Sequence, residues 1–211
     1  MLRLIATTTK GDYKVICPEN WEETSVDQFQ RIVKDWDGED WIQLFSILSG
    51  VEANDIETST DHKLETALYQ CIQFVFAKSE LEDLPIPDEI TLRPIWFSDS
   101  PLVCDVVKIP RKIGRLTIGQ AIQARKLLEE TRDIREAISS VTAIYFQPLI
   151  DKAPFDMMRA IEIEQVILKM PITKIYPIGF FLLRRLNESG QRRNSVWHLI
   201  KNWVRLKRGK R

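Results

Sequence analysis

The sequence predicts an α+β fold that is predominantly helical and contains one small antiparallel sheet. Residues 2–17 form two β-type runs around Lys10-Gly11-Asp12, where Gly11 can supply the backbone conformation of a hairpin turn. Residues 84–110 hold half of the ten prolines and include short extended runs, which proline confines to the edges or ends of sheets. Elsewhere apolar residues recur at helical spacing. We expect the N-terminal hairpin and the proline-rich middle segment to join in one sheet.

Three helices are predicted between these two β-type regions. The first begins where Thr24 or Ser25 can cap it, with Asp27 or Gln28 three residues later in the manner of a capping box. It ends at Asp37-Gly38. A second helix is expected over about 39–48, ending at Gly50, and a third over about 61–78. Their apolar faces carry Phe29, Ile32, Val33 and Trp36, then Trp41, Leu44, Phe45 and Leu48, then Leu64, Leu68, Cys71, Ile72, Val75 and Phe76.

The chain is predicted to be helical again from Thr117 onward. The expected helices cover about 117–130, 133–146, 154–170, a stretch that ends near 186, and 194–207. Pro148 is expected to end the second of these, and Pro177 to break the stretch before 186. We see no internal repeat. We expect one α-rich unit over residues 1–211, and the alternative is a division into 1–110 and 111–211.

No pattern in the sequence indicates catalysis, so we expect a protein that is not an enzyme and needs no cofactor. Both common glycine-rich phosphate loops are missing. Cys17, Cys71 and Cys104 are widely spaced, which predicts buried, reduced thiols and no zinc site. Two acidic clusters, within 37–40 and 55–61, lack the EF-hand pattern, and we interpret them as solvated loops. Glu162 and Glu164 are expected on a solvated helix face.

Charge is distributed very unevenly along the chain. The 30 basic and 30 acidic residues cancel in total. However, residues 184–211 hold ten Lys or Arg and one acid, Glu188, so this segment carries +9 and the remaining residues carry −9. This polarity indicates a partner that recognises charge.

Residues 194–207 within this basic segment predict an amphipathic helix, with two Trp on its apolar half. Three interpretations stay open. The helix docks on the acidic body of its own chain, it binds in a groove of another protein, or it binds an anionic polymer such as nucleic acid, or a membrane surface. The two Trp favour a packed protein interface. The candidate partner-binding residues are Trp197, Ile200, Lys201, Trp203, Val204, Arg205 and Arg208.

Three phrases in the chain carry a family resemblance. The first is Pro18-Glu-Asn-Trp21-Glu-Glu-Thr-Ser-Val-Asp-Gln-Phe29, followed by Phe45-Ser-Ile-Leu-Ser-Gly50. The second is Leu116-Thr-Ile-Gly-Gln-Ala-Ile122, and the third is Ala143-Ile-Tyr-Phe-Gln-Pro148 followed by Phe155-Asp156. Together they resemble small proteins of tailed bacteriophages, namely tail assembly chaperones and accessory tail or baseplate proteins.

The resemblance implies a non-enzymatic protein that binds and masks a tail, tape-measure or baseplate component until assembly. Two alternatives are a permanent structural subunit of the tail or baseplate and a nucleic-acid-binding protein acting through the basic helix. We expect neither a secretory signal nor a membrane span. The expected location is the cytoplasm of the infected bacterial host cell, or the virion, and the oligomeric state is open.

Overall fold

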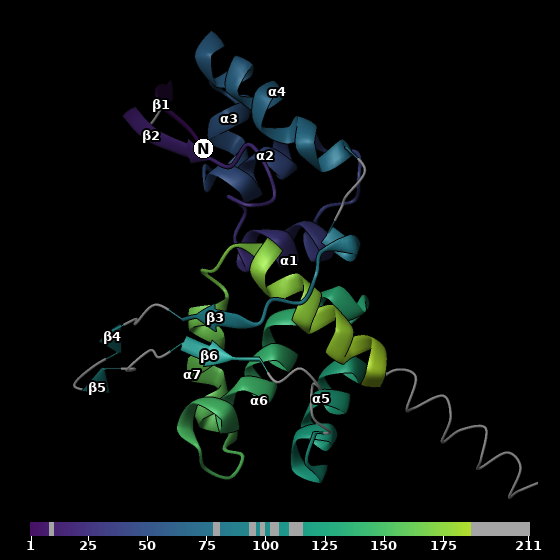
Figure 1. Cartoon of the computed structure of the whole chain (residues 1–211). Coiled ribbons are helices and arrows are strands. Elements are labelled where there is room, and N and C mark those ends of the chain that lie inside the picture. The colour runs from purple at the N-terminus through teal and green to yellow at the C-terminus, as the bar shows by residue number, and fades with distance from the viewer. Residues whose placement is uncertain are drawn as a thin grey trace, which may run out of the picture.

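The computed structural model describes residues 1–8, 11–77, 81–92, 96–97, 100–101, 106–109 and 116–186. Figure 1 shows the N-terminal hairpin with α2, α3 and α4 at one end of the molecule, α5, α6 and α7 at the other, and α1 between them. The predicted class, α+β and predominantly helical, is confirmed. In the part of the chain that the structure describes, no helix is both long and apolar enough to span a membrane.

The strands pair as two-stranded antiparallel ladders. β1 (Leu2–Thr8) pairs with β2 (Gly11–Cys17), so that Leu2 lies opposite Cys17. In the middle segment β3 (Glu89–Thr91) pairs with β6 (Val106–Lys108), and β4 (Trp96–Phe97) pairs with β5 (Ser100–Pro101). The expectation of one sheet shared by the hairpin and the middle segment is wrong, because these ladders are separate. The reason is packing: β1 and β2 contact α4 and α2, whereas Ile90 and Val107 are buried in a different apolar cluster.

The helices of the first half begin and end at the signals in the sequence. They are α1 (Val26–Asp35), α2 (Trp41–Ser49), α3 (Ala53–Glu57) and α4 (His62–Phe76). The Ser25 side chain accepts a hydrogen bond from the Gln28 backbone, and the Gln28 side chain accepts one from the Ser25 backbone, which completes a capping box. α2 ends at Gly50, whose φ of 74° is a left-handed conformation that glycine adopts without strain.

The second half contains α5 (Ile118–Glu130), α6 (Ile138–Asp151), α7 (Met157–Ile167) and a helix over residues 172–186. Of two short 3₁₀ helices, η1 (Leu81–Asp83) lies between α4 and β3, and η2 (Ile134–Ala137) leads directly into α6. Thr117 caps α5 and forms a second capping box with Gln120. The predicted helix start at Thr117 is therefore confirmed.

Pro148 does not end α6, which continues to Asp151. Proline has no backbone N–H, so the carbonyl of Ile144, four residues earlier, loses its partner within the helix. The Gln120 side-chain Nε2 donates to this carbonyl at 2.7 Å, from a position 24 residues away in the chain. The prediction was wrong because a side chain of α5 supplies the hydrogen bond that proline removes from α6.

Pro177 likewise lies inside a continuous helix, contrary to prediction. The helix over 172–186 has a continuous buried apolar face that includes Ile175, Ile178 and Leu182, and this burial offsets one missing backbone hydrogen bond. Gly179 lets the helix approach α6 closely. A Cβ at this position would lie 2.7 Å from Ile138 Cγ2, so any larger residue would clash.

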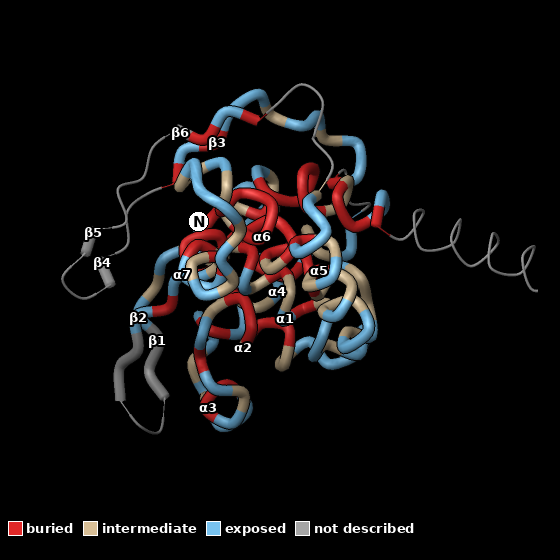
Figure 2. The backbone as a smooth tube through the Cα atoms, turned by 90° about the horizontal axis from the view of Figure 1, so that it is seen from below, coloured by how far each residue is buried: buried red, intermediate tan, exposed pale blue. Residues whose placement is uncertain are grey.

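Two apolar clusters form the interior, and α1 belongs to both. The larger cluster contains the buried faces of α5, α6, α7 and the helix over 172–186, and Phe29 of α1 joins it. The smaller cluster contains the buried residues of β2, α2, α3 and α4, and Ile32 of α1 joins it. Figure 2 shows the buried residues gathered in α6 and the elements around it. Whether the whole chain folds as one unit stays a prediction.

We predict that Gln120→Ala lowers the free energy of unfolding by about 1–3 kcal/mol, because the buried Ile144 carbonyl loses its donor and α5 loses part of its cap. Pro148→Ala restores a backbone N–H to that carbonyl. In a Pro148→Ala background, Gln120→Ala should therefore cost less, roughly the 1 kcal/mol of the cap alone. Denaturant unfolding of the four chains measures this difference, and Gln123→Ala on the same helix is the control. An equal cost in both backgrounds would show that Gln120 does not compensate for Pro148.

Candidate functional site

The partner-binding residues predicted from the sequence lie outside the described residues. The structure therefore leaves this prediction untested. The residues concerned are Trp197, Ile200, Lys201, Trp203, Val204, Arg205 and Arg208.

The phrases that carry the family resemblance contain contacts that hold helices together. The Gln28 Nε2 donates to the Leu48 carbonyl near the end of α2 at 2.6 Å, just as Gln120 donates to Ile144. Both acceptors lack a partner within their own helix, Leu48 because it lies in the last turn of α2 and Ile144 because of Pro148. These polar residues fix the fold and do not form a reactive site.

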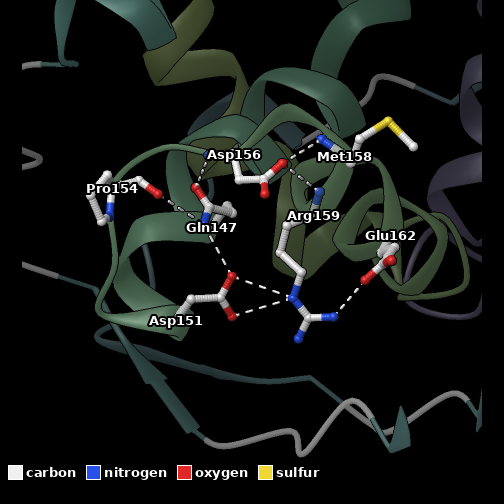
Figure 3. A network of polar contacts seen from close by, with 7 residues as sticks. All are labelled: Gln147, Asp151, Pro154, Asp156, Met158, Arg159 and Glu162. Carbon is white, nitrogen blue, oxygen red and sulfur yellow. Dashed lines mark hydrogen bonds and ion pairs between the residues drawn. The ribbon is translucent and has the colours of Figure 1, made fainter. Parts of the chain in front are cut away.

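The third phrase forms the polar network at the turn from α6 to α7 (Figure 3). The buried Gln147 side chain donates to Asp151 at 3.0 Å and accepts from the Asp156 backbone N–H at 3.0 Å. Asp156 in turn caps α7 by accepting from the Met158 and Arg159 backbones. The network thus aligns the end of α6 with the start of α7.

The charged members of this network are compensated. Arg159 lies 3.3 Å from Asp151 and also pairs with Glu162, and these carboxylates raise the pKa of the guanidinium. Nearby, Glu164 accepts hydrogen bonds from the hydroxyls of Ser139 and Ser140 at 2.6 and 2.5 Å. Glu164 thus tethers α7 to α6 and is half-buried, unlike the solvated face expected for it.

The two acidic clusters noted in the sequence contain helix caps. Asp37 accepts from the backbone N–H groups of Glu39 and Asp40 at 2.9 and 3.1 Å, which lowers the pKa of its carboxyl group. Asp40 caps α2 and Asp61 caps α4. Among the described residues, no three His, Cys, Asp or Glu side chains gather in a way that could hold a metal ion.

Cys17 and Cys71 are buried free thiols, as the sequence predicts. A hydrogen bond with Cys71 and burial both raise the pKa of Cys17, so its thiol stays protonated and is not a nucleophile at neutral pH. Cys104 lies outside the described residues.

An aromatic surface is the most distinctive feature of the described chain. We use this name for Trp36, Trp41, Tyr69 and Phe76, which come from α2, α4 and the end of α1. The Phe76 ring centroid lies 5.6 Å from those of both Trp36 and Trp41, and Tyr69 lies 6.2 Å from Trp41. Trp41, Tyr69 and Phe76 are 46%, 50% and 51% exposed. Large rings with this exposure are typical of protein-binding surfaces.

The turn between α1 and α2 holds the two tryptophans of this surface in place. The Trp36 indole Nε1 donates to the Asp40 carbonyl at 2.9 Å, and Gly38 adopts a φ of 95° that favours glycine. Four exposed carboxylates, Asp35, Asp37, Glu39 and Asp40, lie in or beside the same turn. The aromatic surface is therefore preorganised and bordered by negative charge.

A groove of about 370 Å³ adjoins the aromatic surface, because Trp36 lines both. Its apolar lining includes Trp21, Phe29 and Tyr176, with the Phe29 and Tyr176 rings edge to face at 5.6 Å. Its charged lining residues are Asp37, Glu82 and Arg135, and Arg135 is paired with Asp133 at 2.6 Å. The groove is large enough for one or two side chains of a bound peptide.

The sequence placed Trp36, Trp41 and Phe76 on apolar helix faces, and it did not single out Tyr69. Helical spacing identifies the apolar face of a helix. It does not show how much of that face the neighbouring helices cover, because this depends on tertiary packing. A local signal did exist: four acids lie between residues 35 and 40, next to Trp36 and Trp41, and acidic residues are mostly exposed.

Comparison with known proteins gives no match: no protein-family model, curated protein or solved structure is similar to this chain. The resemblance to phage tail proteins stays a prediction. The charges and exposed surfaces of the chain itself are therefore the observations that bear on function.

We predict that Tyr176 ionises later than an ordinary tyrosine. Burial, together with the charge of Glu82, raises its pKa from 10.0 to about 12. Because the folded pKa lies above the unfolded one, the associated stability is complete below about pH 10 and is lost as the pH rises towards 12. An ultraviolet titration of the phenols should lose a late step, near pH 12, in Tyr176→Phe. An unchanged late step in this variant would contradict the assignment.

Proposed function

We propose that this chain is a non-enzymatic bacteriophage assembly protein, similar to tail assembly chaperones, that binds and masks a tail, tape-measure or baseplate component. The observation that carries the proposal is the aromatic surface, where half-exposed rings lie beside a cluster of carboxylates. The three family-like phrases support the phage context.

Masking would use the aromatic surface as the apolar contact. Trp and Tyr rings contribute much of the energy in protein interfaces when a partner buries them. The neighbouring carboxylates would attract a basic partner and orient it, because opposite charges speed association and disfavour wrong partners. An amphipathic helix with one apolar and one basic face fits these requirements.

The closest alternative is a permanent subunit of the tail or baseplate. Such a subunit would use the same aromatic surface. The two functions differ in stoichiometry, because a chaperone leaves the particle and a subunit stays in it.

The test is genetic complementation in a phage that carries this coding sequence. Deleting the gene should yield filled heads without infectious tails, and the wild-type chain supplied from a plasmid should restore plaques. We predict that a Trp41→Ala, Tyr69→Ala double variant lowers plaque yield by at least about tenfold, a loss expected for interface hot spots. Ile118→Ala, which removes an exposed apolar residue of α5 far along the chain, is the matched control and should complement fully.

Normal tails in the deletion strain would contradict the proposal. Mass spectrometry of purified particles decides between the two functions: absence of the chain supports a chaperone, and stoichiometric presence establishes the structural subunit. Circular dichroism of both variants shows whether a defect reflects binding or loss of fold.

A further inference from the structure

The negative charge of the chain is concentrated in one region. Residues 18–77, which contain α1 to α4, hold thirteen acidic and three basic residues, a net charge of −10. Residues 78–183 hold fifteen acidic and fourteen basic residues and are therefore close to neutral. The basic segment 184–211, at +9, thus has one complementary region within its own sequence, the α1–α4 region.

The same region bears the aromatic surface. Trp41 and Tyr69 expose about half of their area there, and Asp35 and Glu39 are exposed nearby. Within the described residues, neither of these two carboxylates forms an ion pair. The surface therefore offers apolar rings and uncompensated negative charge side by side.

The C-terminal segment has the matching composition. The sequence predicts that Trp197, Ile200 and Trp203 share one face of a helix, with Lys201 and Arg205 on the other. Trp side chains packed against Trp41 and Tyr69 would remove apolar rings of both partners from water. The Lys and Arg residues would then face the carboxylates beside Trp41.

Chain connectivity favours a segment from another molecule. The helix over 172–186 starts against α1, where the Ile172 N–H donates to the Thr24 carbonyl at 2.8 Å. It then runs away from α2 and α4 and ends near α5 (Figure 1). At 1.5 Å per residue it covers about 21 Å. The link 187–193 spans at most about 25 Å when fully extended. To bring the chain's own segment back towards α1, the link would have to retrace the length of the helix in an almost fully extended form. A segment from a second copy is not subject to this constraint.

We propose that the aromatic surface binds the C-terminal segment 194–211 of a second copy of this chain. Two copies exchange these segments reciprocally, which gives a dimer with two identical interfaces. This inference stands apart from the proposed phage role, since it concerns association of the chain with itself.

The test uses two full-length variants and measures molar mass by sedimentation equilibrium. The surface variant is Trp41→Ala with Tyr69→Ala, and the segment variant is Trp197→Ala with Trp203→Ala. The wild type should be a dimer that weakens as salt rises. Each variant alone should dissociate at least about tenfold more readily. An equimolar mixture of the two should regain dimers, because the segment of the surface variant can bind the intact surface of the segment variant. Ile122→Ala on α5 is the control and should stay dimeric.

Several results would overturn the proposal. A monomeric wild type, or variants that dimerise as well as the wild type, would exclude the exchange. A mixture that stays monomeric would also exclude it, because the intact segment of one variant would then not bind the intact surface of the other. If the surface variant loses its helical signal, Asp35→Lys with Glu39→Lys replaces it, because both side chains are exposed. This charge variant should dimerise with a Lys201→Glu, Arg205→Glu chain and not with itself.

Discussion

Helix α1 is the constraint on which the rest of the structure depends, because both apolar clusters include one of its faces. Phe29 packs into the larger cluster and Ile32 into the smaller one. Polar contacts reinforce this position. The Val26 and Asp27 N–H groups donate to the Met170 and Leu168 carbonyls at 2.9 and 3.0 Å, just before the helix over 172–186. Gln side chains of α1 also reach α2 and the Glu136 carbonyl of η2. The orientation of one half relative to the other is thus set at α1.

Much of this fold could be predicted from local sequence, and the failures have one physical origin. Ser25, Thr117 and Gly50 mark helix ends correctly because caps and left-handed turns depend on neighbouring residues. Pro148 misleads because its effect depends on Gln120, a residue distant in sequence. The separate β ladders were missed for a similar reason, since strand partners are chosen by the apolar cluster each strand covers.

The candidate site was harder to predict than the fold. Helical spacing identifies Trp41 and Phe76 as apolar-face residues but cannot show that about half of each side chain stays exposed. The charge imbalance, by contrast, was visible from the sequence, and the structure adds its location, since the acidic residues of 18–77 lie in the helices α1 to α4 and in the turns between and before them. If the basic segment of a second copy covers that surface, a phage partner with a similar basic helix would have to displace it. Self-association and masking would then use one interface.

Native-state hydrogen exchange tests the central claim most directly, namely that α1 couples the two clusters into one cooperative unit. The slowest amides of α4 report on the smaller cluster, and those of α6 on the larger one. The coupling predicts that both sets exchange with the same opening free energy, equal to that of global unfolding. If α4 instead exchanges through an opening of lower free energy that leaves α6 protected, the clusters are independent and α1 does not couple them.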